Sequence, residues 1–353
     1  MSRVVVAMSG GVDSSVAAAL LVEQGYEVIG IMLRLWSEPD RDDTNRCCSP
    51  DSMALAKRIA ARLGIPFYVV DSRNIFRTTV VQGFIDGYAK GITPNPCLVC
   101  NREIRWNFLL DQAIALGADY LATGHYARVA ETPSGSYSLL RGKDPQKDQS
   151  YVLHVLEQPH LARALFPVGS YQKSEIRDIA LHYGFPVANR PDSQDLCFLG
   201  GDDYRDFLSR NAPAALKPGP ILSREGAYLG KHQGLAFYTI GQRKGLGISS
   251  PYPYYVENKD IHSNALIVCR QEELGHMVLY AHDVNWISGH PPRAPIRLQV
   301  KIRYKAEEAW ATVSPLEEGR IEALFDIPLR DITPGQAAVF YEGDICLGGG
   351  LIE

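Results

Sequence analysis

A run of small and polar residues near the start of the chain, Ser9-Gly10-Gly11-Val12-Asp13-Ser14-Ser15, has the composition of a phosphate-binding loop. It follows the buried apolar run Val4–Met8 and precedes a segment typical of a helix. Glycines let a backbone approach an anion closely, and the unpaired N–H groups of a helix N-terminus attract negative charge. The serine hydroxyls add donors, and Asp13 is a candidate ligand of Mg²⁺. We therefore predict a phosphate site at this turn.

The same loop lacks the Lys-Ser/Thr pair with which a kinase-type P-loop clamps the transferred phosphoryl group. Its Ser-Gly-Gly-x-Asp-Ser pattern instead resembles the signature of the PP-loop pyrophosphatases. That resemblance implies attack at the α-phosphorus of ATP and release of pyrophosphate. A Gly-Gly turn that merely caps a helix is the simpler interpretation, but it leaves unexplained a seven-residue match directly behind the first buried strand.

Two of the seven cysteines, Cys97 and Cys100, form a C-x-x-C within the Pro-rich segment 91–101, interpreted as a loop. We place Cys100 just before a predicted helix start, where the helix dipole lowers a thiol pKa. A structural zinc site is disfavoured because a second close pair is missing. A sulfur-carrying or redox pair of Cys100 with Cys197, a three-cysteine iron–sulfur site with an open fourth position, and inert thiols all stay open. The remaining thiols are interpreted as inert: Cys47, Cys48, Cys269 and Cys346.

The elements that must position these residues alternate in the N-terminal half. Strands are predicted at residues 4–8, 27–33, 67–70 and 120–123, and helices at 14–24, 52–63, 75–90 and 103–116. This alternation indicates an α/β fold with a doubly wound parallel sheet of the Rossmann-like type. Ligands of such sheets bind beyond the carboxyl ends of the strands. The loops after Met8, Leu33 and Thr123 should therefore face one cleft.

The pattern changes near residue 200. A Pro- and Ala-rich stretch, 213–220, is a candidate boundary, and residues 221–275 show short mixed strands. Strict alternation over 296–303, followed by further short strands, predicts a small C-terminal β-barrel or sandwich, of which we favour the barrel. Lys301, Arg303 and Lys305 are expected on one face of that strand. We predict a PP-loop domain over 1–203, a small central domain over 204–277 and a barrel domain over 278–353.

The bulk composition limits the partners. The chain has 353 residues, 46% of them apolar, and a net charge of −4, so any nucleic acid must bind local basic clusters rather than a basic whole. Candidate clusters are 141–147, 243–244 and 301–305; solvated charged faces are the alternative. Signal-peptide and membrane-span patterns are missing, so we expect a cytoplasmic protein without a membrane partner.

Several motifs together resemble the bacterial tRNA-specific 2-thiouridylase family, MnmA. They run in family order to the C-terminus: SGGVDSSVAA, TPNPCLVCNREIRW, ATGHYAR, KDQSYVL, DSQDLCF, YTIGQRKGLGI, VKIRY, TPGQAAVFY and GDICLGGGLIE. The resemblance implies ATP-dependent 2-thiolation of the wobble uridine in the tRNAs for Lys, Glu and Gln. ATP adenylates the base O2, and sulfur from a cysteine persulfide displaces AMP. A cysteine desulfurase or a sulfur-relay protein is implied as the persulfide donor.

The same resemblance assigns roles position by position. Cys100 would be the nucleophile and Cys197 the persulfide carrier. ATP would be held by Ala7, Met8, Ser9, Gly10, Gly11, Val12, Asp13, Ser14, Leu33 and Gly124. tRNA would contact Asn95, Pro96, Cys97, His125, Lys147, Asp148, Gln149, Arg303, Tyr304 and Gln336, with residues 95–97 at the target base. Some family members have Asp where Cys97 stands; here a thiol replaces any general base and permits a [4Fe–4S] cluster on Cys97, Cys100 and Cys197.

Two other function classes are weighed against this prediction. A PP-loop amidotransferase or adenylating ligase would usually bring a glutaminase domain, for which the sequence gives no sign. A non-enzymatic tRNA-binding metalloprotein would use the C-x-x-C structurally, but it would leave the Ser9–Ser15 loop without a purpose.

Overall fold

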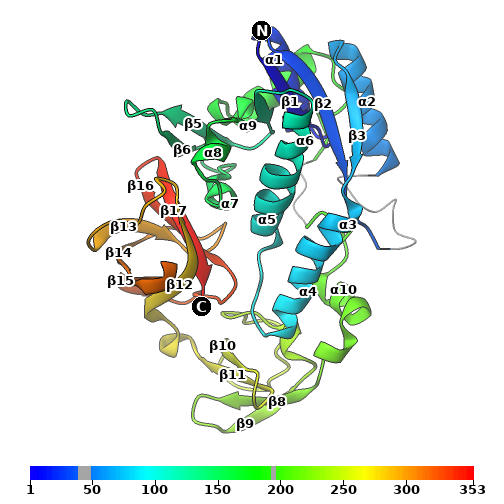
Figure 1. Ribbon diagram of the computed structural model, residues 1–353. Helices are drawn as coiled ribbons and strands as arrows, with labels where there is room; N and C mark the ends of the chain where they lie inside the picture. Colours follow the sequence, from blue (N-terminus) through cyan, green and yellow to red (C-terminus); the bar gives the residue numbers. More distant parts are fainter. Residues whose placement is uncertain (39–48, 192–195) are drawn as a thin grey trace.

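The N-terminal part is built on a five-stranded parallel sheet. The computed structural model describes residues 1–38, 49–191 and 196–353 (Figure 1). The strand order is β3-β2-β1-β4-β7. The strands are β1 (Arg3–Ala7), β2 (Glu27–Arg34), β3 (Phe67–Asp71), β4 (Tyr120–Ala122) and β7 (Ala164–Leu165). This arrangement confirms the predicted doubly wound parallel sheet.

Helices cover both faces of this sheet because successive strand residues point to opposite sides. Val4 and Val6 pack with α1 (Val12–Glu23), α2 (Pro50–Leu63) and α9 (Lys173–His182). Val5 packs on the other side against Trp106 and its helix. The α2 helix starts at Pro50, two residues before the predicted start, with Ser49 as N-cap accepting from the Ser52 N–H, and ends at Leu63 with Gly64 as C-cap.

Two long helices carry π-helical stretches. The first consists of α3 (Arg73–Phe76), η2 (Arg77–Val81) and α4 (Gln82–Ala89). The second consists of α5 (Pro96–Val99), η3 (Cys100–Leu109) and α6 (Leu110–Ala115). The second starts seven residues earlier than the predicted Glu103. Asn95 caps it by accepting from the Cys97 N–H at 3.2 Å, and Pro96 takes the first helical position, which proline favours.

This early start corrects the prediction for the two cysteines. The loop ends at Asn95, so Cys97 lies in the first helical turn and Cys100 in the second. The helix dipole acts mainly within the first turn. Cys100 therefore does not occupy the helix start at which the sequence had placed it.

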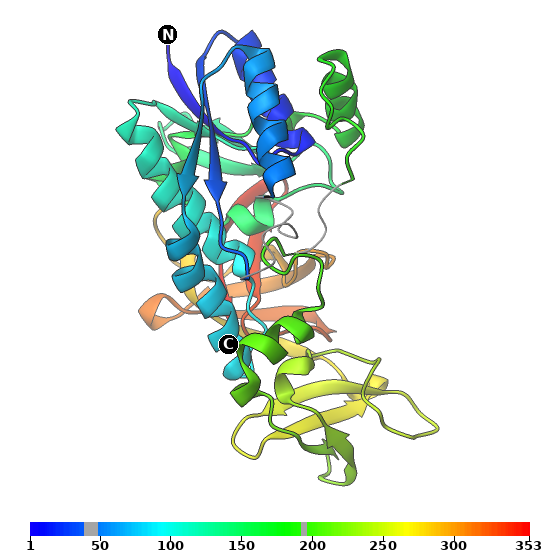
Figure 2. The same ribbon diagram turned by 90° about the vertical axis from the view of Figure 1, so that its right-hand side faces the viewer.

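The central part is a small four-stranded sheet that follows α10 (Tyr204–Asn211). Its order is β10-β11-β8-β9. The strands are β8 (Gly219–Ser223), β9 (Tyr228–His232), β10 (Tyr254–Asp260) and β11 (Ala265–Arg270). Ile221, Val256 and Val268 form its core. In both views this sheet lies at the far end of the molecule from the N-terminus (Figure 2).

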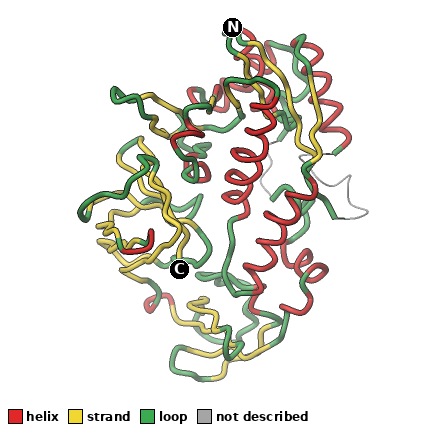
Figure 3. Tube along the Cα trace, viewed as in Figure 1, coloured by secondary structure: helices red, strands yellow, loops and turns green. Residues whose placement is uncertain are grey.

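The C-terminal part is a closed six-stranded β-barrel, which decides between the predicted barrel and sandwich. Its order is β12-β15-β14-β13-β16-β17, and β12 closes onto β17 where Ala281 pairs with Ile352. The strands are β12 (His276–Trp286), β13 (Ile296–Lys301), β14 (Ala309–Pro315), β15 (Ile321–Leu329), β16 (Ala337–Glu342) and β17 (Ile345–Ile352). Figure 3 shows most of the helices in the N-terminal part, beside its parallel strands, and mainly strands in the other two.

The barrel corrects one further expectation. Strand β13 ends at Lys301, so Arg303 and Tyr304 lie in the following turn and do not share a strand face with Lys301. The pairing with β16 stops at Lys301 opposite Val339. Beyond it, the Arg303 guanidinium turns away to donate to the Ile240 carbonyl at 2.9 Å.

A hairpin of the N-terminal part extends the barrel sheet. It consists of β5 (Ala127–Glu131) and β6 (Tyr137–Arg141), and β6 pairs with β17 through Leu139 opposite Cys346. The same apolar cluster contains Leu139, Trp106 and Tyr341. The N-terminal part and the barrel are therefore joined by both a continuous sheet and a common core. None of the described helices is long and apolar enough to cross a membrane.

Candidate functional site

The phosphate loop adopts the strand–turn–helix geometry that its glycines predict. β1 ends at Ala7, and α1 begins behind Gly11, its N-cap. Gly10 has φ of +69°, and a Cβ there would collide with the Ser52 carbonyl. Arg190 fixes the turn from outside by donating to the Gly10 carbonyl at 3.0 Å. The backbone conformation and the packing both require glycine here.

The serines of the loop bind one another and the loop backbone. The Ser9 N–H donates to Ser14 Oγ at 3.2 Å, and Ser15 Oγ donates to the Gly11 carbonyl at 2.7 Å. Ser15 is fully buried, so its hydroxyl stabilises the turn. Ser9 is exposed, and its hydroxyl lies 3.3 Å from that of Ser14. The candidate phosphate donors are thus Ser9, Ser14 and the N–H groups of the first helical turn.

Gly124 brings the end of β4 against this loop. A Cβ at Gly124 would lie 2.7 Å from the Ser14 nitrogen, so the two backbones are in direct contact. Leu33, near the end of β2, is half-buried and packs against two apolar clusters, one that contains Trp106 and one that contains Phe84. The structure thus places the loop after β4 directly beside the loop after β1, as the parallel topology predicts.

Asp13, the predicted Mg²⁺ ligand, already has a cation beside it. Its Oδ1 and Oδ2 accept from Lys173 Nζ at 2.7 and 2.8 Å, and Tyr126 donates its hydroxyl to Oδ1 at 2.7 Å. A metal ion on Asp13 would have to displace the Lys173 ammonium. Sequence reasoning missed Lys173. The available signal was a lysine at the first position of a helix, where the dipole disfavours a cation.

The two cysteines assigned to sulfur transfer meet at one apolar cluster. Cys100 and Cys197 are both half-buried, and both pack against the cluster that contains Phe76, Phe84 and Phe198. Cys197 reaches this place although it lies 97 residues after Cys100. Cys97, in contrast, is exposed. Residues 192–195 of the DSQDLCF motif, and Cys47 and Cys48, lie outside the described residues.

The structure does not form the three-thiol metal site. Across the described ranges, no group of three His, Cys, Asp or Glu side chains is arranged to hold a metal ion. Cys97, Cys100 and Cys197 all lie within those ranges. The arrangement of the described residues therefore gives no support to the predicted [4Fe–4S] cluster.

His125 is buried and bonded at both ring nitrogens. Nε2 lies 2.7 Å from Arg105 Nη1, and Nδ1 lies 2.7 Å from Thr123 Oγ1. Arginine only donates, so Nε2 accepts and the ring is neutral, with its proton on Nδ1. Burial, and then the charge of Arg105, hold the pKa of His125 well below its ordinary value. His125 thus connects the end of β4 to the helix formed by α5, η3 and α6, called the cysteine helix because it carries Cys97 and Cys100. Nothing in the sequence indicated that Arg105 would contact His125.

The barrel supports the start of the cysteine helix. Gln336 Nε2 donates to the Thr93 carbonyl at 2.8 Å, and the Thr93 N–H donates to the Pro334 carbonyl at 2.8 Å. Tyr304 lies near Cys97 and Asp148: burial first, and then these two groups, raise the pKa of Tyr304 to about 12. Three predicted tRNA contacts, Cys97, Asp148 and Tyr304, thus lie near one another, and a fourth, Gln336, bonds to the segment just before Asn95.

The Lys147–Gln149 segment is a turn held by hydrogen bonds within the protein. Buried Asp148 accepts from the Gly142 and Ser150 N–H groups at 3.0 and 3.1 Å. Gln149 Oε1 accepts from the Tyr126 N–H at 3.0 Å. Lys147 remains partly exposed. Two of the predicted tRNA contacts, Asp148 and Gln149, thus hold the turn itself.

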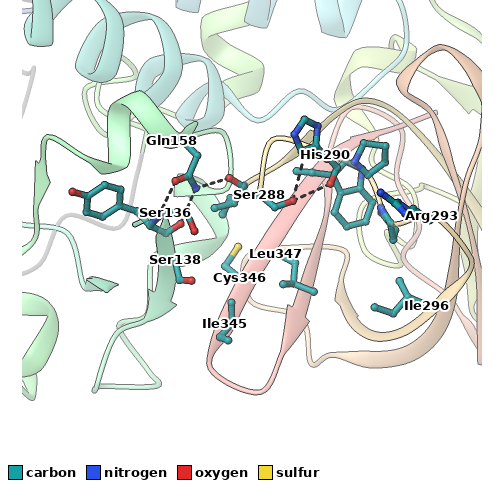
Figure 4. Close-up of a pocket in the computed structure, with 15 residues that line it drawn as sticks. Ser136, Ser138, Gln158, Ser288, His290, Arg293, Ile296, Ile345, Cys346 and Leu347 are labelled. Atoms are coloured by element: carbon teal, nitrogen blue, oxygen red, sulfur yellow. Dashed lines mark hydrogen bonds between the residues drawn. The ribbon is translucent and has the colours of Figure 1, made fainter. Parts of the chain in front are cut away.

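A cavity of about 410 Å³ lies away from these residues, between β6, β17 and the loop after β12 (Figure 4). None of the predicted site residues lines it. Gln158 bridges its wall by donating to the Tyr137 and Ile287 carbonyls at 2.7 Å each. Cys346 in its lining is fully buried, and burial raises the pKa of this thiol to about 12.

Comparisons with known proteins cover the whole chain. Family models match in three consecutive parts: a tRNA methyl transferase HUP domain over 2–201, a tRNA methyl transferase PRC-barrel domain over 205–270 and an aminomethyltransferase beta-barrel domain over 276–352.

Three relatives bear the name tRNA-specific 2-thiouridylase MnmA. The protein of Moorella thermoacetica is 51% identical, over 99% of this chain and 98% of its own. That of Symbiobacterium thermophilum is 50% identical, over 99% and 92%, and that of Roseiflexus castenholzii 49%, over 100% and 99%. Among solved structures, a 4-thiouridine synthetase–RNA complex with bound ATP aligns with a TM-score of 0.38 at 16% identity, covering 60% of this chain and 50% of that one.

Proposed function

We propose a two-stage mechanism for this chain, which belongs to the tRNA-specific 2-thiouridylase family. Members of the family form 2-thiouridine in tRNA with a PP-loop nucleotide-binding domain, so the chain is a tRNA sulfurtransferase. In the proposed first stage, ATP adenylates O2 of the wobble uridine in the tRNAs for Lys, Glu and Gln. In the second, sulfur from a cysteine persulfide replaces that oxygen.

The activation stage is assigned to the phosphate loop. The uridine O2 attacks the α-phosphorus of ATP, pyrophosphate leaves, and the base carries AMP on its oxygen. A uracil carbonyl oxygen is a poor leaving group, whereas AMP is a good one. The left-handed Gly10 and the close contact of Gly124 with Ser14 support this assignment, because a side chain at either glycine would fill space at the turn.

The sulfur stage is assigned to Cys197 and Cys100. The terminal sulfur of a Cys197 persulfide attacks C2 of the base, and AMP departs with the former O2. The Cys100 thiolate then attacks Cys197 Sγ, which forms the Cys100–Cys197 disulfide and leaves the second sulfur on C2 as the thiocarbonyl. A thiol reductant restores both cysteines. Their common apolar cluster is the observation that carries this assignment.

The tRNA is assigned to the surface between the cysteine helix and the barrel. A wobble uridine lies in a loop, where a base is cheap to extrude. Cys97 lies near Tyr304, and Gln336 bonds to Thr93 just before Asn95, so residues Asn95–Cys97 are a candidate platform for the extruded base. A cysteine desulfurase or a sulfur-relay protein would load the persulfide.

One reaction tests this function. The protein is incubated with ATP, Mg²⁺, unmodified tRNA and a persulfide donor, and the tRNA nucleosides and nucleotide products are measured by mass spectrometry. The proposal expects 2-thiouridine, AMP and pyrophosphate in equal amounts. ADP and phosphate would contradict the activation stage. Anaerobic purification gives the second readout: visible absorption that disappears in Cys97→Ser would contradict the persulfide relay in favour of the cluster.

A further inference from the structure

The phosphate loop is short of positive charge. Loops of the kinase type carry a lysine that reaches the outer phosphates, but no lysine stands between Ser9 and Ser15. The triphosphate of ATP nonetheless places several negative charges at the helix N-terminus that binds it. A cation for that charge must come from elsewhere in the chain or from a metal ion.

Lys173 stands where such a cation is needed. Its Nζ lies 2.7 and 2.8 Å from the two carboxylate oxygens of Asp13, a residue of the loop itself. Lys173 occupies the first position of α9, and Asp13 the second position of α1. The ion pair thus joins the N-terminal turns of two helices, which is where anions bind.

Lys173 is held at its backbone, which leaves its ammonium as the adjustable part. The Lys173 N–H donates to Asp144 Oδ2 at 3.0 Å, and Gln172 and Glu175 form a capping box around it. The residue is only 9% exposed. A buried ammonium beside two helix N-termini is unfavourable unless an anion neutralises it. Asp13 supplies that anion in the present arrangement, and a polyphosphate carries more negative charge than one carboxylate.

We infer that Lys173 is the phosphate-binding lysine of this enzyme, held on Asp13 until ATP arrives. The inference rests on the proposed ATP site. When the outer phosphates occupy the N-terminal turn of α1, the Lys173 ammonium moves from Asp13 to their oxygens. Asp13, still hydrogen-bonded by Tyr126, is then released to bind Mg²⁺. Separation of this ion pair thereby gives the leaving pyrophosphate two cations, the Lys173 ammonium and the Mg²⁺ bound by Asp13.

Nucleotide binding to the full-length protein tests this inference. Lys173→Met keeps the length of the side chain and removes its charge, and the exposed Lys57→Met on α2 is the matched control. Titration calorimetry measures ATP, pyrophosphate and AMP. Lys173→Met should weaken ATP and pyrophosphate by at least about tenfold, and AMP by less than about twofold, because AMP lacks the outer phosphates. Equal losses for ATP and AMP, or no loss for either, would overturn it.

Asp13→Asn should change pyrophosphate affinity in the opposite direction. In EDTA, where Asp13 cannot contribute through a metal, this variant frees Lys173 from its carboxylate, so pyrophosphate should bind more tightly than to the unmodified protein, by about threefold or more. Unchanged or weaker binding would contradict the inference. Melting temperatures of both variants identify a folding defect, and Lys173→Arg, which keeps the charge, should then retain ATP binding.

The result is separable from the proposed function. If thiolation fails in every preparation but pyrophosphate binding still depends on Lys173, the lysine assignment stands and the sulfur stage falls. If thiolation proceeds and Lys173→Met binds ATP normally, only the lysine assignment falls.

Discussion

The phosphate loop and the cysteine helix are supported by different parts of the molecule. The loop is held within the N-terminal part, by Lys173 on Asp13 and by Arg190 on Gly10. The start of the cysteine helix is held by the barrel, through Gln336 and Pro334 on Thr93. Activation of ATP should therefore depend on the N-terminal part alone, whereas sulfur transfer should depend on the barrel as well.

Substitution of either cysteine should have the largest effect, because it should stop the sulfur stage and leave ATP binding intact. Cys100→Ser and Cys197→Ser should each lower 2-thiouridine formation by more than about 1,000-fold, because a hydroxyl neither carries a persulfide nor forms the disulfide. ATP affinity should be unchanged in both, since neither thiol lies at the phosphate loop. Nucleoside mass spectrometry and calorimetry measure the two quantities; full thiolation by either variant would refute the role of that cysteine.

Gly124→Ala should impair the activation stage. Its Cβ would lie 2.7 Å from the Ser14 nitrogen, so the phosphate loop must shift. We expect ATP to bind at least about tenfold more weakly, and thiolation to fall with it. Gly83→Ala is the control, since a Cβ at this position of α4 meets nothing within 4 Å. Normal ATP affinity in Gly124→Ala would show that the contact does not shape the nucleotide site.

Gln336→Leu should impair only the sulfur stage. It removes one hydrogen bond to the Thr93 carbonyl, worth about 0.5–1.5 kcal/mol, and loosens the segment before Asn95. Thiolation at saturating tRNA should fall about three- to tenfold with ATP affinity retained. A matching loss of ATP affinity would contradict the division of support. A loss confined to tRNA affinity would identify Gln336 as a direct tRNA contact instead.

Acid should lower stability rather than act on one stage, through two buried histidines: His125, and His154, whose Nδ1 lies 2.7 Å from the Tyr151 carbonyl. Burial lowers the pKa of His154 to about 4, and burial, and then the charge of Arg105, hold the pKa of His125 well below its ordinary value. The unfolded chain therefore binds protons first, and stability is lost as pH falls below about 6.5, by up to about 1.4 kcal/mol per pH unit for each histidine. Melting temperatures between pH 7.5 and 5 should fall, and less steeply in His154→Gln. A flat profile would contradict neutral burial.

The sequence pattern predicted those elements that depend on interactions between residues close together in the chain. The Val4–Met8 strand, the Gly10 turn and the Ser49 cap follow from short-range periodicity and backbone chemistry, and all three are present. The start of the cysteine helix was also local, since Asn95-Pro96 is a cap followed by a first-turn proline. It was missed because the surrounding prolines indicated a loop.

Long-range partners were beyond sequence reasoning. Lys173 is 160 residues from Asp13, and Arg190 is 180 from Gly10. Neither pairing has a periodic signature, because tertiary folding alone brings the partners together. From the residues alone, the pair of Cys100 with Cys197 was one of several open alternatives, and the cluster against which both pack depends on three separate helices.

The path of one oxygen atom tests the central claim most directly. A tRNA carrying ¹⁸O at O2 of the wobble uridine is thiolated in ordinary water, and the AMP is analysed by mass spectrometry. Adenylation of that oxygen predicts one ¹⁸O in the phosphate of AMP for every 2-thiouridine formed. Label found in water, with unlabelled AMP, would show that sulfur replaces the oxygen without its transfer to ATP, and would contradict the account.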